Sequence, residues 1–196
     1  MIYTKNSQED ILNWLKLNLS EERFSHSLGC AQTAVELAKK FKLDEEKAYI
    51  AGLLHDCAKC FKKEELLEII KKHMPEVAEC EISNHKTLHA PVSAYFAKNE
   101  FGVEDEEILS SIRWHTLGKT NMSDFEKVIF LADKIEPNTR DSAYREEILK
   151  TLEQENGLNK ALLICYKETI KSLVNRGLEI CGPTIEIYNQ LLADLK

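Results

Sequence analysis

The stretch that decides the fold is Ala51-Gly-Leu-Leu-His-Asp-Cys-Ala-Lys59, in which an apolar segment ends in a histidine and an aspartate side by side. The segment before it has helical spacing, so His55 and Asp56 are expected to leave a buried helix near its end. A buried carboxylate is costly unless a cation or a charged donor meets it. Imidazole nitrogen and carboxylate oxygen together suit a divalent metal. The pair therefore predicts one edge of a metal site, and other helical segments offer His26, His89, His115 and Asp133 as partners.

Helical signals continue from end to end, whereas strand-like alternation and hairpin dipeptides such as Asn-Gly or Asp-Gly are missing. We therefore expect an all-α, single-domain helical bundle over 1–196, with a motif-bearing core at about 20–140 and helices at about 142–196 packed on it. The candidate ligands lie near helix ends, so distant segments can present them to one metal centre in the interior. Helices are expected to begin after four capping sites, namely Ser7, Ser20, Asp44 and the capping box Ser123-Asp-Phe-Glu126. Further helices are expected over 64–73, 87–102, 105–114, 143–154 and 158–176, the last with Gly177 as C-cap. A final helix should follow Pro183, and a looser segment should follow Pro75.

Composition narrows the classes of function. The 196 residues carry a formal net charge of −7, which argues against a nucleic-acid or anionic-membrane binder but not against a small phosphorylated ligand. No apolar run approaches the roughly 20 residues of a membrane span, and the N-terminus lacks the core of a secretory signal. A cytoplasmic protein with six reduced cysteines is expected. Cys57-Ala-Lys-Cys60 has CxxC spacing, but no second pair accompanies it, so a metal or redox role is disfavoured.

Each candidate residue has a plainer interpretation. His26 alone could be a hydrogen-bonded core histidine, and Asp133 could be a solvated helix-end acid paired with Lys134 or Arg140. His89 could be a helix cap, and His115 could stack on its neighbour Trp114. His73 and His85 lie among polar residues and are expected on the surface, and the apolar face that includes Trp14 could be core or a dimer contact.

The pattern His26, His55-Asp56, Asp133 resembles the H...HD...D signature of the HD-domain metal phosphohydrolases. Longer stretches are similar to the bacterial YqeK-type members of that family, over the chain from about Ser20 to Asn189. These stretches are Arg23-Phe-Ser-His-Ser-Leu-Gly29, Gly52-Leu-Leu-His-Asp-Cys-Ala-Lys59, Leu88-His-Ala-Pro-Val92, Ile112-Arg-Trp-His-Thr116 and Leu131-Ala-Asp-Lys-Ile-Glu-Pro137.

The resemblance implies a symmetrical dinucleoside tetraphosphatase that cuts diadenosine tetraphosphate into two nucleoside diphosphates at an iron-type centre. It makes His26, His55, Asp56 and Asp133 the primary metal ligands. It assigns a second metal or the polyphosphate to His89 and His115, and phosphate contacts to Arg23, Lys59 and Arg140. Family members often have a His-Pro step before the last helix, where this chain has Cys181-Gly-Pro183, so the nucleotide contact expected at that step does not carry over to this chain. Arg176 is a further candidate for substrate binding.

The residues alone agree with a metal-dependent hydrolase, in which Asp56, His89 and His115 would be catalytic and a histidine would serve as proton donor to the departing diphosphate. Without thiolate ligands, the set fits iron or manganese at least as well as structural zinc, and magnesium is a further alternative. One or two metals, and a homodimer, are compatible with the sequence. The competing functions are an HD hydrolase of another nucleotide, a non-catalytic nucleotide-sensing module, and a helical scaffold with structural zinc.

Overall fold

The computed structural model describes residues 2–84 and 86–196, and within those ranges it contains eleven α-helices, one 3₁₀ turn and no β-strand. The expected all-α fold is confirmed. The helices are α1 (Gln8–Asn18), α2 (Glu21–Phe41), α3 (Glu45–Leu54), α4 (Lys63–His73), α5 (Glu79–Ser83), α6 (His89–Asn99), α7 (Glu106–Trp114), α8 (Asp124–Ile135), α9 (Ser142–Thr151), α10 (Gly157–Asn175) and α11 (Gly182–Asp194), with η1 (Cys57–Cys60) after α3.

The predicted helix starts are confirmed by their hydrogen bonds. The side chains of Ser7, Ser20 and Asp44 each accept a backbone N–H from the first turn of the helix that follows. At Ser123 the full capping box is present, because the Glu126 side chain also accepts the Ser123 N–H. These caps satisfy donors that the first helical turn leaves without intrahelical partners.

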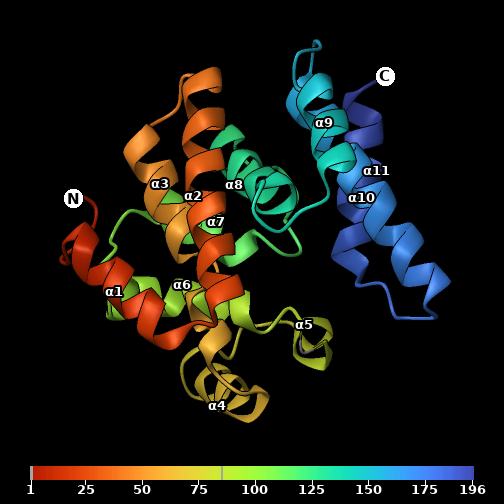
Figure 1. Cartoon of the computed structure of the whole chain (residues 1–196). Coiled ribbons are helices and arrows are strands. Elements are labelled where there is room, and N and C mark those ends of the chain that lie inside the picture. The colour runs from red at the N-terminus through yellow and green to blue at the C-terminus, as the bar shows by residue number, and fades with distance from the viewer. Residues whose placement is uncertain (1, 85) are drawn as a thin grey trace.

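The helix α2 is central, with α3 and α8 packed along it and α7 behind them (Figure 1). Gly52 lets α3 approach closely, because a Cβ at this position would lie 2.7 Å from the Cα of Ala31 in α2. The apolar faces of these helices form one large buried cluster that includes Leu53, Leu54 and Ile129. The close approach matters for the site, since His55 directly follows α3.

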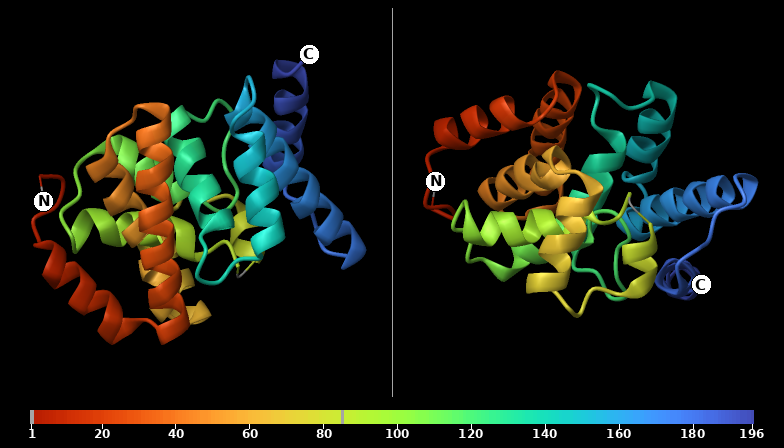
Figure 2. Two further views of the ribbon diagram at one scale, coloured as in Figure 1. Left: turned by 45° about the horizontal axis from the view of Figure 1, so that its top comes forward. Right: turned by 90° about the horizontal axis from the view of Figure 1, so that it is seen from below.

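The C-terminal helices α9, α10 and α11 gather on the side of α8 away from α1, and the two chain ends lie on opposite sides of the molecule (Figures 1 and 2). They share the large apolar cluster through residues such as Leu162 and Ile187. Phe130 of α8 stacks on Tyr166 of α10 with ring centroids 5.5 Å apart, and Tyr166 Oη donates to the Leu117 carbonyl. No helix of the described residues has the length and apolar character needed to cross a bilayer.

Two local expectations need correction. The segment after Pro75 is not simply loose, since it contains the short helix α5, whose Glu81 is buried and forms a two-point ion pair with Arg113. No side chain caps α5, so its sequence signal is weak. The helix expected over 143–154 ends three residues earlier, as α9 (Ser142–Thr151). The expectation that His73 is exposed is confirmed, whereas His85 lies outside the described residues.

Candidate metal centre

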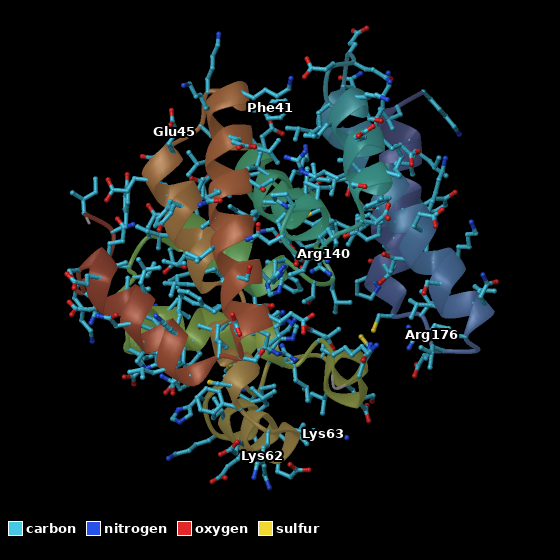
Figure 3. The ribbon with its side chains drawn as sticks, in the orientation of Figure 1. Phe41, Glu45, Lys62, Lys63, Arg140 and Arg176 are labelled. Atoms are coloured by element: carbon cyan, nitrogen blue, oxygen red, sulfur yellow. The ribbon has the colours of Figure 1, made fainter. Side chains whose placement is uncertain are left out.

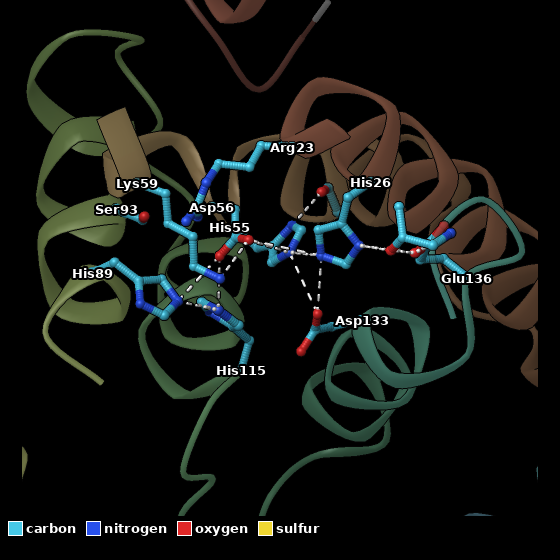
Figure 4. Close-up of polar contacts among 12 residues, drawn as sticks. Arg23, His26, His55, Asp56, Lys59, His89, Ser93, His115, Asp133 and Glu136 are labelled. Carbon is cyan, nitrogen blue, oxygen red and sulfur yellow. Dashed lines mark hydrogen bonds and ion pairs between the residues drawn. The ribbon is translucent and has the colours of Figure 1, made fainter. Parts of the chain in front are cut away.

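Six candidate side chains from five helical segments meet in the interior (Figure 4). His26 comes from the buried face of α2, His89 from the start of α6, and Asp133 from the last turns of α8. His55 and His115 are the C-cap residues of α3 and α7, and Asp56 follows His55. Their exposed fractions lie between 0% and 6%, so the convergence expected from the sequence is present.

The imidazoles form two pairs whose Nε2 atoms face each other. His26 Nε2 lies 3.2 Å from His55 Nε2, and His89 Nε2 lies 3.1 Å from His115 Nε2. His55 and His115 donate from Nδ1 to the carbonyls of Gly52 and Ile112, at 2.6 and 2.7 Å. Those bonds leave the Nε2 lone pairs directed inward, which is the arrangement that a metal ligand requires.

Asp56 lies between the two imidazole pairs. Its Oδ2 is 3.7 Å from His26 Nε2 and 3.6 Å from His55 Nε2, while its Oδ1 is 3.1 Å from His89 Nε2 and 3.4 Å from His115 Nε2. Two triads with ligand spacing therefore share this one carboxylate, namely His26-His55-Asp56 and Asp56-His89-His115.

The Asp56 carboxylate also gives a direct test of whether a metal fits. Its Oδ1 is buried and makes no well-oriented hydrogen bond within the described chain, although two ring nitrogens are near. Buried polar atoms are almost always satisfied, so such an oxygen between two imidazoles suits a cation. The chemistry of the donor set, nitrogen and oxygen without thiolate, agrees with a divalent metal centre.

Asp133 flanks the first triad, with its Oδ1 3.1 Å from His26 Nε2 and 3.8 Å from His55 Nε2. The same carboxylate accepts from Arg140 at 2.8 Å and from Lys134 at 2.5 Å. Asp133 is therefore buried and directed at the cluster, and it is not a solvated helix-end acid. Its ion pairs with Lys134 and Arg140 are nevertheless both present.

Burial and charge set the protonation states of the cluster. Burial lowers the pKa of His55 to about 3 and that of His89 to about 4, so both are neutral and can donate lone pairs near pH 7. Burial opposes protonation of His26 too, but the neighbouring Asp133 and Glu136 carboxylates outweigh it and raise its pKa. Burial would raise the pKa of Asp56 and of Asp133, yet the imidazoles around Asp56 and the Lys134 charge beside Asp133 lower both pKa values.

Glu136 is a residue of this site to which the sequence patterns assigned no role. It is fully buried, and its Oε1 accepts from His26 Nδ1 at 2.9 Å. The carboxylate also accepts the backbone N–H groups of Asn138 and Thr139 at 2.7 and 3.0 Å and the Thr139 hydroxyl. Gly29 makes room for it, because a Cβ there would lie 2.4 Å from Glu136 Oε2. Its sequence signals are its place between Ile135 and Pro137 at the end of an apolar helix and its presence in the family-like stretch that ends at Pro137.

The predicted phosphate-binding cations do not all lie together. Arg23, Lys59 and Arg140 line a cavity of about 210 Å³ that reaches His26 and Asp56. Lys59 Nζ lies 2.9 Å from Asp56 Oδ2 (Figure 4). Arg176 lies apart from Arg140, at the end of α10, and lines a separate cavity (Figure 3).

Two side interpretations are settled by contacts. Trp114 is covered by the Arg113 guanidinium, 4.0 Å from its ring centroid, while the His115 ring packs beside His55 and His89. Cys57 is buried with its thiol directed at the Ser93 carbonyl, and burial raises its pKa. Neither Cys57 nor Cys60 belongs to a triad with metal-ligand spacing among the described residues.

Comparison with known proteins places this geometry in a family. The model described as "HD domain" matches residues 23–138, a range that contains all six side chains of the cluster. The chain belongs to the HD domain family. The HD chain is 40% identical over 188 residues to a Bacillus subtilis protein, covering 95% of this chain and 98% of that protein. It is 38% identical over 185 residues to a Halalkalibacterium halodurans protein, covering 94% and 97%. Both relatives are named symmetrical bis(5'-nucleosyl)-tetraphosphatase.

A solved structure agrees with the HD assignment over nearly the whole chain. It is described as a predicted HD superfamily hydrolase involved in NAD metabolism from Clostridium acetobutylicum, and it is 40% identical with a TM-score of 0.90. The match covers 96% of this HD chain and 98% of that structure. The helices outside residues 23–138 therefore belong to the common architecture.

Proposed function

We propose that this HD chain hydrolyses dinucleoside tetraphosphates, with diadenosine tetraphosphate as the representative substrate, symmetrically into two nucleoside diphosphates. The near full-length relatives with that name support the reaction, and the observation that carries it in this chain is Asp56 between two inward-facing imidazole pairs. The four-residue set His26, His55, Asp56 and Asp133 is the proposed first metal site. A second site would use Asp56, His89 and His115.

We further propose iron as the metal, with manganese, magnesium and zinc as the alternatives that metal analysis must separate. A divalent metal in this cluster supplies Lewis acidity, lowers the pKa of water and neutralises phosphate charge. The neutral imidazoles of His55 and His89 serve as ligands without first losing a proton near pH 7.

The remaining chemistry belongs to the cations around the cluster. Hydrolysis in the middle of the phosphate chain forms a bond between a water oxygen and one inner phosphorus, and it breaks the bond from that phosphorus to the oxygen that bridges it to the other. The bridging oxygen leaves with the second nucleoside diphosphate, and the water proton is released. Each product then carries two phosphates. Arg23, Lys59 and Arg140 would hold the non-bridging oxygens, with Arg140 kept in place by the Asp133 carbonyl and carboxylate, each at 2.8 Å.

We propose His89 and His115 as metal ligands in place of the expected role as proton donors. Their Nε2 atoms face each other and Asp56, which supports a ligand role for each inward nitrogen. Lys59, at 2.9 Å from Asp56, would supply a cation for the charge that develops on the departing diphosphate.

The direct test is product analysis after incubating the purified, metal-loaded protein with diadenosine tetraphosphate in ¹⁸O-labelled water. ADP is expected as the sole nucleotide product, with label in half of the molecules. Release of AMP and ATP would refute the symmetrical cut. Nucleoside monophosphates, cyclic dinucleotides and guanosine alarmones form the comparison panel, and tight ADP binding without turnover under every metal would favour the sensing module instead.

A further inference from the structure

Besides the cavity lined by Arg23, Lys59 and Arg140, two larger cavities with different linings extend from the metal centre. The C-terminal cavity, about 250 Å³, reaches from His115 and Asp133 to residues of α10 and α11 such as Tyr166 and Thr184. The second, which we call the Phe61 cavity, is about 400 Å³ and is lined by Arg23, Lys59, Phe61, Lys63, Leu66, Lys86 and His89. The two share Lys59, Lys86 and His89. A ligand that crosses the cluster can therefore enter both.

The charge of the Phe61 cavity is unlike that of the whole chain. Four of its seven lining residues are cationic and none is a carboxylate, in a protein whose formal net charge is −7. Within the described residues, Arg23, Lys63 and Lys86 make no ion pair, and Lys59 pairs only with Asp56 of the cluster. Cations grouped around a cavity that has no carboxylate in its lining favour an anionic ligand.

Phe61 gives the cavity an aromatic surface next to those charges. It follows η1, five residues after Asp56, and its ring packs against Phe96 with centroids 4.7 Å apart. The ring is only partly buried and also lines the cavity, and Leu66 adds an apolar contact. A fixed aromatic ring beside phosphate-binding cations is the combination that holds a nucleobase and its phosphates, because every base offers a π-face for stacking.

A symmetrical cut places further demands on the protein. When the middle bond of a four-phosphate chain lies at the metal centre, one nucleoside lies two phosphates away on each side. A single nucleoside site would position only half of such a substrate.

We propose that the Phe61 cavity is the site of the second nucleoside diphosphate half of the substrate, with Phe61 stacking on its base and Arg23, Lys63 and Lys86 holding its phosphates. The first half then occupies the C-terminal cavity. This assignment rests on the proposed function, and it makes the two halves of the substrate bind to unlike surfaces. Lys63 is the first residue of α4 (Figure 3), and it lines the Phe61 cavity.

ADP binding tests the assignment without catalysis. The metal-loaded protein is titrated calorimetrically with ADP, and two molecules per chain are expected for the wild type. Phe61→Leu keeps an apolar side chain against Phe96 but removes the π-face, and Lys63→Glu reverses a rim charge. Each variant is expected to bind one ADP in the same concentration range. A single ADP in the wild type, or two in both variants, would overturn the assignment.

Kinetics give a second test that separates the two halves. Adenosine 5'-tetraphosphate has the same phosphate chain but lacks the second nucleoside, so Phe61→Leu should affect it less than diadenosine tetraphosphate. Losing one base–aromatic stack should lower the preference for diadenosine tetraphosphate, measured as the ratio of the kcat/KM values, by about 5- to 150-fold. Phe61→Tyr keeps the π-face, so its kcat/KM ratio should stay close to that of the wild type. A purely structural role for Phe61 does not predict this difference between the Tyr and Leu variants.

The control is Lys98→Gln, which removes a cation exposed on α6 and outside the cavity. It should leave both the ADP stoichiometry and the substrate ratio unchanged. If Phe61→Leu lowers kcat/KM equally for both substrates, the second half-site is refuted, while the proposed symmetrical hydrolysis is not affected. Conversely, a wild type that releases AMP and ATP refutes the proposed function, and the ADP titration still decides whether the Phe61 cavity binds a nucleotide.

Discussion

Glu136→Gln is the sharpest test of how this chain holds a metal, because the substitution changes charge and hydrogen bonding but hardly changes volume. The wild-type carboxylate accepts from His26 Nδ1 at 2.9 Å and from the backbone N–H groups of Asn138 and Thr139. Acceptance at Nδ1 keeps the proton there and leaves the His26 Nε2 lone pair for a ligand. A glutamine amide has one acceptor oxygen and one donor group where the carboxylate has two acceptors.

Both orientations of the glutamine are unfavourable. If its NH₂ group faces Asn138 N–H, one backbone hydrogen bond becomes a contact between two donors. If the NH₂ group faces His26, the imidazole must accept at Nδ1 and carry its proton on Nε2, which removes a metal ligand. Loss of an outer partner of a ligating histidine lowers metal affinity by about 10- to 100-fold, equivalent to about 1.4 to 2.8 kcal/mol. The second orientation belongs to the upper end of that range.

The assay is competition for the metal between the protein and a chelator of known affinity, followed by metal analysis of the protein fraction. Glu153→Gln is the matched control, because Glu153 lies on the surface and pairs only with Lys40 in the described chain. An affinity within twofold of the wild type in Glu136→Gln, with an unchanged circular dichroism spectrum, would show that Glu136 does not position His26.

Gly29→Ala should reproduce the metal-affinity loss of Glu136→Gln without replacing a polar side chain, because the new Cβ would clash with Glu136 Oε2 and displace the carboxylate; wild-type affinity in the chelator assay would contradict this. Asp56→Asn should lower turnover of diadenosine tetraphosphate by more than the roughly 100-fold expected for an outer partner, since Asp56 belongs to both triads. Retention of the wild-type metal content, measured by elemental analysis, would contradict the shared role. With the metal removed by a chelator, the free energy of unfolding should fall as the pH drops below about 6.5. His55 and His89 should each contribute about 1.4 kcal/mol per pH unit to this fall. The sign follows because their folded pKa values, about 3 and about 4, lie below the unfolded value, so the unfolded chain takes up the protons first. Thermal melts between pH 7 and pH 5 measure this loss, and His89→Gln should make it shallower.

The helix caps and the cluster were accessible from sequence because both depend on short-range patterns. Ser123 and Glu126 satisfy a local hydrogen-bonding rule, and they do so in the structure. His55 and Asp56 follow an apolar helix that must be buried, so their side chains start from the interior. A metal site then follows from the cost of leaving such a carboxylate alone.

The features that escaped prediction depend on contacts between distant segments. The short helix α5 has no capping side chain, and Glu81 is buried because Arg113, 32 residues later, meets it with two hydrogen bonds. Glu136 contacts His26, which lies 110 residues earlier in the sequence, and no local sequence pattern around Glu136 predicts this partner. The two cavities are likewise formed by residues from several helices, so the sequence could propose cations but could not distribute them between two sides of the cluster.

The six-residue cluster and one wall of the neighbouring C-terminal cavity come from different parts of the sequence. Every side chain of the cluster precedes Lys134, whereas the outer wall of the C-terminal cavity is built from α10 and α11. A substitution at Cys181, just before α11, can therefore change the lining of the C-terminal cavity without replacing any of the six cluster side chains. Changes in α10 and α11 are thereby separated in the sequence from the six side chains of the cluster, so variants of these two helices can be screened for altered ligand binding while every cluster residue stays the same.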